Sequence, residues 1–247
     1  TDDRLYAIAQ LIRLGVDLGM VYNATKIDMF FLEKFKHIVE FEEVIRNNPN
    51  SIETIRDAKL LGISDKYIAQ VWGCTEHDIY RMREANNIFP VYKMIDTCAS
   101  EFSSYVPYFY STYEAENESI VSDRKKIIVL GSGPIRIGQG VEFDYSTVHA
   151  IWSIRRAGYE AIIINNNPET VSTDYTTSDK LYFEPLTVED VMNIIHLEKP
   201  EGIVVSLGGQ TAINLAEPLH RLGVPIIGTD VQAIENAENR DAFEKIM

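Results

Sequence analysis

Apolar residues recur at every third or fourth position through most of the first 90 residues, which is the spacing of amphipathic helices. Gly15, Pro49, Gly62 and Gly73 lie where such helices should end, because glycine and proline interrupt helical geometry. We interpret the aromatic stripe of the second helix as core or interface rather than as a ligand site. The predicted helices span residues 4–15, 27–46, 52–61, 65–72 and 76–86.

The segment from about residue 90 to 122 follows neither the helical nor the strand period for long. It is rich in tyrosine and phenylalanine and ends in a polar, acidic stretch. We predict an extended connector, and we expect its tyrosines to pack rather than to serve an active site. The helical domain with this connector would then cover residues 1–122.

After residue 123, short apolar runs alternate with helical stretches, and this order is typical of a doubly wound α/β domain. The run Ala161–Ile164 is entirely apolar, which suits a parallel strand that is covered on both faces. We therefore predict an all-helical domain followed by a mostly parallel, Rossmann-like domain over 123–247. Its strands are expected at 127–130, 161–165, 182–184, 202–207 and 225–227, and its helices at 142–156, 187–197, 211–222 and 231–237.

A glycine-rich loop joins the first of these strands to the first helix. Backbone N–H groups in such a loop, together with the helix N-terminus, can bind an anion. The loop fits neither common phosphate loop, because Arg136 replaces the third glycine of the dinucleotide pattern and Gln139-Gly140 replaces the P-loop lysine and hydroxyl residue. A tight structural turn is the alternative interpretation. The loop glycines are Gly131, Gly133, Gly138 and Gly140.

Two further loops follow predicted strands, at 165–174 and 208–211. Ligands of such sheets bind beyond the carboxyl ends of the strands, so the three loops should share one edge. The charged candidates for a site there are Glu142, Glu169, Asp174 and Arg136. The loop at 208–211 contributes Gly208, Gly209, Gln210 and Thr211.

Composition excludes several classes of function. The net charge is −14. The chain has 12 basic and 20 acidic residues before Arg124, and 11 basic and 17 acidic residues from Arg124 on. An acidic surface opposes binding to nucleic acid or to anionic membranes. No apolar run could span a membrane, and the five histidines and two cysteines have no metal-ligand spacing. We expect reduced thiols and a cytoplasmic protein.

The helices expected at 65–72 and 76–86, joined through Gly73, also fit a helix-turn-helix. From Asp65 to Glu84 the chain carries three basic and four acidic residues, a balance that would repel DNA phosphates. A small bundle explains the same pattern, so DNA binding is the weaker alternative.

Four motifs occur together after residue 123. They are the glycine segment Gly131–Tyr145, Asn-Asn-Asn-Pro-Glu-Thr-Val-Ser-Thr-Asp at 165–174, Tyr-Phe-Glu-Pro-Leu-Thr at 182–187 and Gly-Gly-Gln-Thr at 208–211. In this order they resemble the large chain of carbamoyl phosphate synthetase. The resemblance implies that residues 1–122 are the helical oligomerisation domain between two homologous halves. Residues 123–247 would be the pre-ATP-grasp part of the second half, which phosphorylates carbamate.

The resemblance also implies an activity and partners for the whole enzyme. It would use two ATP, bicarbonate and ammonia from glutamine to make carbamoyl phosphate for arginine and pyrimidine synthesis. MgATP would be required, with Mg²⁺ or Mn²⁺ as the metal and K⁺ as an additional candidate ion. A small glutaminase subunit and a homo-oligomer would be the partners.

Within the resemblance, Glu142 and Glu169 match carboxylates along the path by which carbamate reaches the second active site. The equally weighted alternative is that Glu142 caps a helix and Glu169 holds a turn. The ATP-grasp fold would begin near Asn239 and is essentially missing, so we expect this chain alone to bind no cofactor or metal and to be inactive. A stand-alone nucleotide-binding α/β domain with a helical interaction module is the alternative function.

Overall fold

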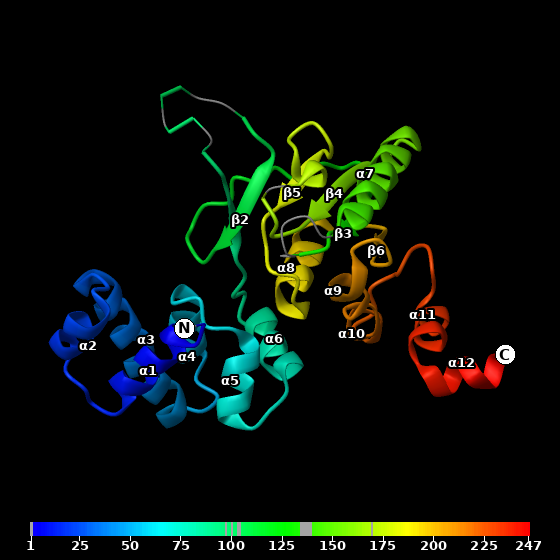
Figure 1. Cartoon of the computed structure of the whole chain (residues 1–247). Coiled ribbons are helices and arrows are strands. Elements are labelled where there is room, and N and C mark those ends of the chain that lie inside the picture. The colour runs from blue at the N-terminus through cyan, green and yellow to red at the C-terminus, as the bar shows by residue number, and fades with distance from the viewer. Residues whose placement is uncertain (1, 97, 100, 103–104, 134–139, 169) are drawn as a thin grey trace. The chain divides into compact units, whose positions relative to one another are not determined.

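The computed structural model describes residues 2–247 except 97, 100, 103–104, 134–139 and 169. The chain divides into two compact units, Thr1–Phe89 and Pro90–Met247 (Figure 1). The first unit is helical and the second is built on a sheet. An all-helical region followed by a mostly parallel α/β domain confirms the predicted fold class.

The helical unit contains the five predicted helices and one that the sequence pattern did not reveal. The additional helix, α2, is only eight residues long and includes Gly19, so it is too short to display a helical period. The Asp17 side chain caps it by accepting the Met20 N–H, and Lys26 ends it in a left-handed conformation. The helices are α1 (Arg4–Arg13), α2 (Leu18–Thr25), α3 (Met29–Asn47), α4 (Ile52–Leu60), α5 (Asp65–Trp72) and α6 (Glu76–Ala85).

The helical unit buries only part of its apolar side chains. Ile8, Val21 and Leu32 form a buried cluster that fastens the first three helices together. By contrast, Phe30 and Phe31 are 58% and 57% exposed. The aromatic stripe predicted as core or interface is therefore in large part a surface of this unit.

The second unit contains a six-stranded sheet with the order β1-β2-β5-β4-β3-β6. The pair β1 and β2 is antiparallel, and every other neighbouring pair is parallel. The strands are β1 (Val91–Met94), β2 (Tyr108–Thr112), β3 (Lys126–Leu130), β4 (Glu160–Ile164), β5 (Lys180–Tyr182) and β6 (Gly202–Val204).

Helices cover both faces of this sheet, as the doubly wound prediction requires (Figure 1). Successive strand residues point to opposite faces, so Val129 packs with Ile151 of α7 while Ile128 packs with Ile194 of α8. The helices around the sheet are α7 (Val141–Arg156), α8 (Val188–Glu198), α9 (Gly209–Ile213) and α10 (Ala216–Arg221).

The segment expected as a connector instead supplies β1 and β2, and the compact units meet at residues 89 and 90 rather than at 122. The aromatic residues explain this difference. Tyr92 and Phe109 are fully buried, and their rings contact that of Tyr182 at centroid distances of 4.9 and 5.6 Å. Aromatic residues favour strands because they pack well on a pleated surface.

Four other boundaries differ from the prediction, and one of them is the end of β6, at Val204 rather than at 207. The single helix expected over 211–222 is divided into α9 and α10, which places Pro218 in the first turn of α10, where its missing N–H costs no hydrogen bond. Segment 225–227 makes only an isolated bridge, between Ile203 and Ile226. Strand β5 lies two residues earlier than expected. The chain continues through α11 (Val231–Glu238) and α12 (Arg240–Ile246).

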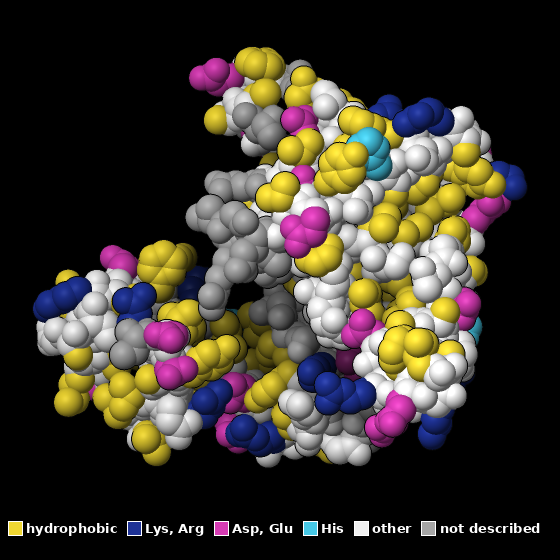
Figure 2. All heavy atoms as spheres, turned by 45° about the vertical axis from the view of Figure 1, so that its right-hand side comes forward, with side chains coloured by type: hydrophobic (Ala, Val, Ile, Leu, Met, Phe, Trp, Pro, Cys, Tyr) yellow, Lys and Arg dark blue, Asp and Glu magenta, His cyan; other side chains and the backbone are white. Residues whose placement is uncertain are grey.

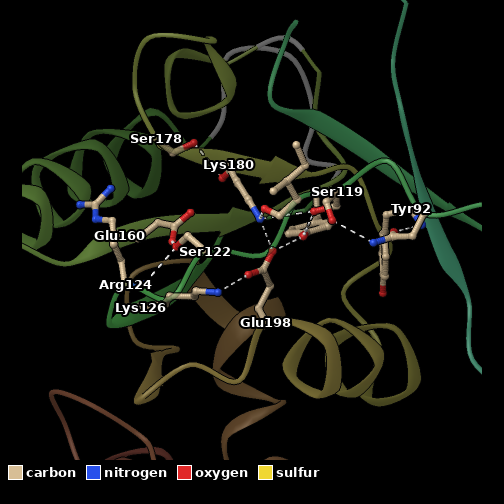
Figure 3. A network of polar contacts seen from close by, with 12 residues as sticks. Tyr92, Ser119, Ser122, Arg124, Lys126, Glu160, Ser178, Lys180 and Glu198 are labelled. Atoms are coloured by element: carbon tan, nitrogen blue, oxygen red, sulfur yellow. Dashed lines mark hydrogen bonds and ion pairs between the residues drawn. The ribbon is translucent and has the colours of Figure 1, made fainter.

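A network of buried charges fastens the amino ends of the strands (Figure 3). The Glu198 carboxylate accepts hydrogen bonds from Lys126 Nζ at 2.9 Å, from Lys180 Nζ at 2.7 Å and from the Tyr182 hydroxyl. Lys180 also donates to the carbonyl of Ile120, in the segment that leads into β3. The network therefore lies at the amino ends of the strands, whereas the glycine loops lie at their carboxyl ends.

Candidate functional site

The glycine loops meet where the sheet changes direction. Strand β3 lies between β4 and β6, so the carboxyl ends of β3 and β6 form the switch point at which such sheets bind ligands. Gly131 follows β3 and Gly208 comes shortly after β6. A Cβ atom on Gly208 would overlap the Gly131 carbonyl and lie 2.7 Å from its carbon. Only glycine allows the two loops to approach this closely.

The loop after β4 joins the same edge through Asn165. Its Oδ1 accepts the N–H of Gly133 at 3.0 Å, and a Cβ atom on Gly131 would lie 2.6 Å from its Nδ2. Gly133 itself has a φ of 71°, which favours glycine. The described parts of the three predicted loops therefore lie together at one edge of the sheet.

Two amide atoms at this edge are buried without a hydrogen-bond partner among the described residues: Nδ2 of Asn165 and Oδ1 of Asn166. Buried polar atoms are almost always hydrogen-bonded, so such atoms mark functional or strained places. We did not predict these two residues as part of the site. The signal was present in the sequence, as a run of three asparagines directly after an apolar strand.

Helix α7 begins at the same edge, after Gly140 in a left-handed conformation with a φ of 76°. Glu142 lies exposed in its first turn, where the helix dipole favours a negative charge. The N-cap residue is Gly140, which has no side chain that could cap the helix. Among the described residues, no ion pair or hydrogen bond engages its carboxylate.

Asp144, which we did not predict as a site residue, connects α7 to the loop after β4. Its two carboxylate oxygens accept the N–H groups of Val171 at 3.0 Å and Ser172 at 2.9 Å. Asp174, which we did predict, is exposed and accepts the N–H of Thr176 at 3.2 Å within its own turn.

The Tyr108 side chain lies near Asp174. Burial, followed by the charge of the Asp174 carboxylate, raises the pKa of the Tyr108 hydroxyl to about 12, so this phenol stays protonated at neutral pH.

The last predicted loop packs against the first turn of α7. Gly209 has a φ of 64°, and a Cβ atom there would lie 2.9 Å from the Phe143 ring. Thr211 reaches the other glycine loop, with its methyl group 3.5 Å from where a Cβ of Gly133 would lie. Gln210 points elsewhere: its amide donates to Asn214 at 2.9 Å and to Glu238 at 3.1 Å.

Three predicted site residues, Arg136, Gly138 and Glu169, lie outside the described residues. Within the described part of the chain, no group of three or more His, Cys, Asp or Glu side chains could hold a metal ion. No helix there is long and apolar enough to cross a membrane. Cys74 and Cys98 form no disulfide within the described part of the chain.

Each of the two units matches a known protein family. Residues 123–236 match the carbamoyl phosphate synthase preATP-grasp domain. Residues 1–87 match the oligomerisation domain of the carbamoyl-phosphate synthetase large chain. The two matches occur in one chain and in the order that the sequence motifs had indicated.

Proposed function

Since the chain belongs to the family of carbamoyl phosphate synthetase large chains, we propose two roles for it in a glutamine-dependent synthetase. The helical unit mediates self-association, in keeping with the oligomerisation domain that it matches. The sheet unit supplies one wall of the site that phosphorylates carbamate. The parent enzyme is an ATP-dependent ligase that works with a small glutaminase subunit in the cytoplasm and serves arginine and pyrimidine synthesis.

The meeting of the three loops at the switch point is the observation that carries the second role. The backbones of Gly131 and Gly208 are in contact there, the Asn165 side chain joins them, and the first turn of α7 adds the carboxylate of Glu142. Carbamate is hydrolysed easily, so its route should exclude bulk water. A carboxylate in the wall can accept hydrogen bonds from the carbamate NH₂ group. We propose that Glu142 has this role, with Glu169, Arg136 and Asp174 in the same wall.

The chain by itself should not catalyse the reaction. Phosphoryl transfer needs cationic groups and a bound metal around the moving phosphoryl group. The sequence has no lysine at the P-loop position, and the described residues hold no cluster of metal ligands. MgATP would therefore bind in the parent enzyme, with Mg²⁺ or Mn²⁺ as the metal and K⁺ as an additional candidate, rather than in this chain.

A thermal-shift titration of the chain with MgATP, NAD and duplex DNA tests this assignment. A ligand that binds only the folded state raises the melting temperature by mass action. We expect no shift with any of the three. A shift with MgATP would favour a stand-alone nucleotide-binding domain, and a shift with DNA would favour the helix-turn-helix alternative.

The wall itself is tested in the parent large chain with ammonia as the nitrogen source. Glu142→Ala should lower carbamoyl phosphate formation about tenfold, the equivalent of one lost hydrogen bond, while bicarbonate-dependent ATP hydrolysis continues. The matched control is Glu201→Ala, at the opposite edge of the sheet, which should leave both rates unchanged. Equal rates in the Glu142 variant and the control would contradict the role of Glu142.

A further inference from the structure

A single carboxylate holds the segment after β4 against α7. Both oxygens of Asp144 accept backbone N–H groups, that of Val171 at 3.0 Å and that of Ser172 at 2.9 Å. Asp144 lies in the first turn of α7, and the two N–H groups belong to η1 (Val171–Thr173), a short 3₁₀-helix. Ser172 is 1% exposed, so its N–H depends on this partner. Hydrogen bonds to a charged acceptor are also stronger than those between neutral groups.

Apolar packing between the same two elements cannot fix their position as the hydrogen bonds do. Val171 lines one groove with Tyr145 and Val148 of α7. Figure 2 shows that hydrophobic side chains gather on the surface over α7. Val171 is nevertheless 64% exposed, and a hydrophobic contact has no preferred direction. The two directional bonds to Asp144 therefore set where the segment lies along the helix.

Other side chains hold the rest of this segment, and they also act on its main chain. From β2, the Tyr108 hydroxyl donates to the carbonyl of Thr173, which is 3% exposed. Thr177 Oγ1 donates to the carbonyl of Val171 at 2.9 Å. Contacts to the main chain fix the path of a segment whatever side chains it carries. The segment is therefore built to present its neighbours in a defined place.

Both ends of the contact lie close in sequence to carboxylates that we propose for the carbamate wall. Glu142 comes two positions before Asp144 on α7. Glu169, which is outside the described residues, comes two positions before Val171. Side chains two positions apart on a helix do not face each other. Glu142 is therefore left for the wall while Asp144 holds the segment that leads from Glu169.

We propose that Asp144 is a positioning residue for carbamate phosphorylation, which fixes Glu169 relative to Glu142 by holding η1 against α7. The inference rests on the proposed role of the wall and adds to it a residue that acts through others rather than on carbamate itself. Such residues matter because a misplacement of ~1 Å in a site can lower a rate ~10²-fold.

Hydrogen exchange in this chain tests the contact itself. Asp144→Asn keeps the shape of the side chain, but its amide offers one acceptor oxygen where the carboxylate offers two. The amide of Val171 or of Ser172 should then exchange at least about tenfold faster, while the amides of β4 keep their rates. The matched control is Asp17→Asn, because Asp17 caps α2 and both residue types cap helices equally well. Wild-type exchange at both amides in Asp144→Asn would overturn the proposal.

The effect on the reaction is measured in the parent large chain with ammonia as the nitrogen source. The readout is the amount of carbamoyl phosphate formed per ATP hydrolysed in the presence of bicarbonate. Asp144→Asn should lower this ratio about tenfold, as Glu169→Ala should. A general loss of folded protein would lower both rates together and leave the ratio unchanged. Asp17→Asn should leave the ratio and both rates at their wild-type values.

A double-mutant cycle separates this inference from the wall on which it rests. If Asp144 acts by positioning Glu169, the variant with both substitutions should have the same ratio as Glu169→Ala alone. A further loss of about tenfold in that variant would refute the positioning role. A normal ratio in Asp144→Asn beside a low one in Glu169→Ala would also refute it and leave the wall intact. Normal ratios in both single variants would refute the role of Glu169 in the wall, and the inference with it.

Discussion

Replacement of Glu198 should strongly destabilise the sheet unit. Its carboxylate is fully buried and is shared by the ammonium groups of Lys126 and Lys180, both also buried, and by the Tyr182 hydroxyl. The two lysines begin β3 and β5, and Glu198 ends α8. Glu198→Gln keeps the shape of the side chain but removes the negative charge that both ammonium groups need.

The expected cost follows from the two charges left behind. Removing one partner of a buried ion pair typically costs ~3–5 kcal/mol, because an uncompensated charge stays in the interior. The glutamine oxygen can still accept one hydrogen bond, so we expect a loss of about 3 kcal/mol. That is a large part of the ~5–15 kcal/mol that stabilises an ordinary protein.

Hydrogen exchange of the β4 amides measures this loss, because core-strand amides exchange through global opening of their unit. A loss of about 3 kcal/mol should accelerate their exchange by roughly two orders of magnitude. The control is Glu201→Gln, which breaks the exposed pair of Lys125 and Glu201, 2.7 Å apart. Exposed pairs contribute about 0–1 kcal/mol. If the Glu198 variant exchanged no faster than this control, the buried lysines would not depend on that charge.

The dependence on pH gives an independent check. Burial alone would raise the pKa of Glu198, but hydrogen bonds from Lys180 and Tyr182, followed by the charge of Lys180, lower it overall. A carboxyl group with a lowered pKa in the folded state stabilises the protein above its unfolded pKa of ~4.3 and loses that effect in acid. The difference between the wild type and Glu198→Gln should therefore shrink as the pH falls below about 4.

Two further substitutions test other parts of the sheet unit. Burial raises the pKa of Glu184 to about 7. Between pH ~4.3 and 7 the folded state therefore holds a proton that the unfolded state has lost. The free energy of unfolding of the wild type should fall over this range by up to ~1.4 kcal/mol per pH unit. In urea titrations Glu184→Gln should remove this slope and be the more stable protein at pH 8; an unchanged slope would contradict the assignment. Gly208→Ala should cost about 1–3 kcal/mol, because its Cβ would overlap the Gly131 backbone. In Gly19→Ala the new Cβ would lie 2.8 Å from the Asp17 carboxylate that caps α2. The helix propensity that alanine gains, ~1 kcal/mol, offsets a shift of that cap. This variant should therefore lose little stability in the same thermal melts, and equal losses would refute the overlap argument.

The sequence alone determined the features that depend on local chemistry. The period of apolar residues located most helices and strands, and glycines at fixed positions located the loops where backbones approach closely. The capping box of Thr75 and Asp78 in α6 is an interaction of the same local kind, between residues three positions apart. These signals suffice because helix periods, caps and positive φ values depend on residues within a few positions of one another.

The limits of the prediction appear where a contact joins distant parts of the chain. The connector gave no clear period, because Tyr92 and Phe109 become strand residues only by packing on Tyr182. Asp144 and Asn165 were inside recognised motifs, but their partners are known only from the folded loops.

Tertiary structure decided which charges are buried together and which apolar faces stay uncovered. Lys126 and Glu198 are 72 residues apart in the chain, and nothing in the sequence pairs them. The period of α7 reveals apolar residues on two sides, yet only the folded unit shows that one side meets the sheet and the other meets solvent. The physical reason is that burial and ion pairing are properties of positions in space, which the sequence specifies only through the complete set of contacts.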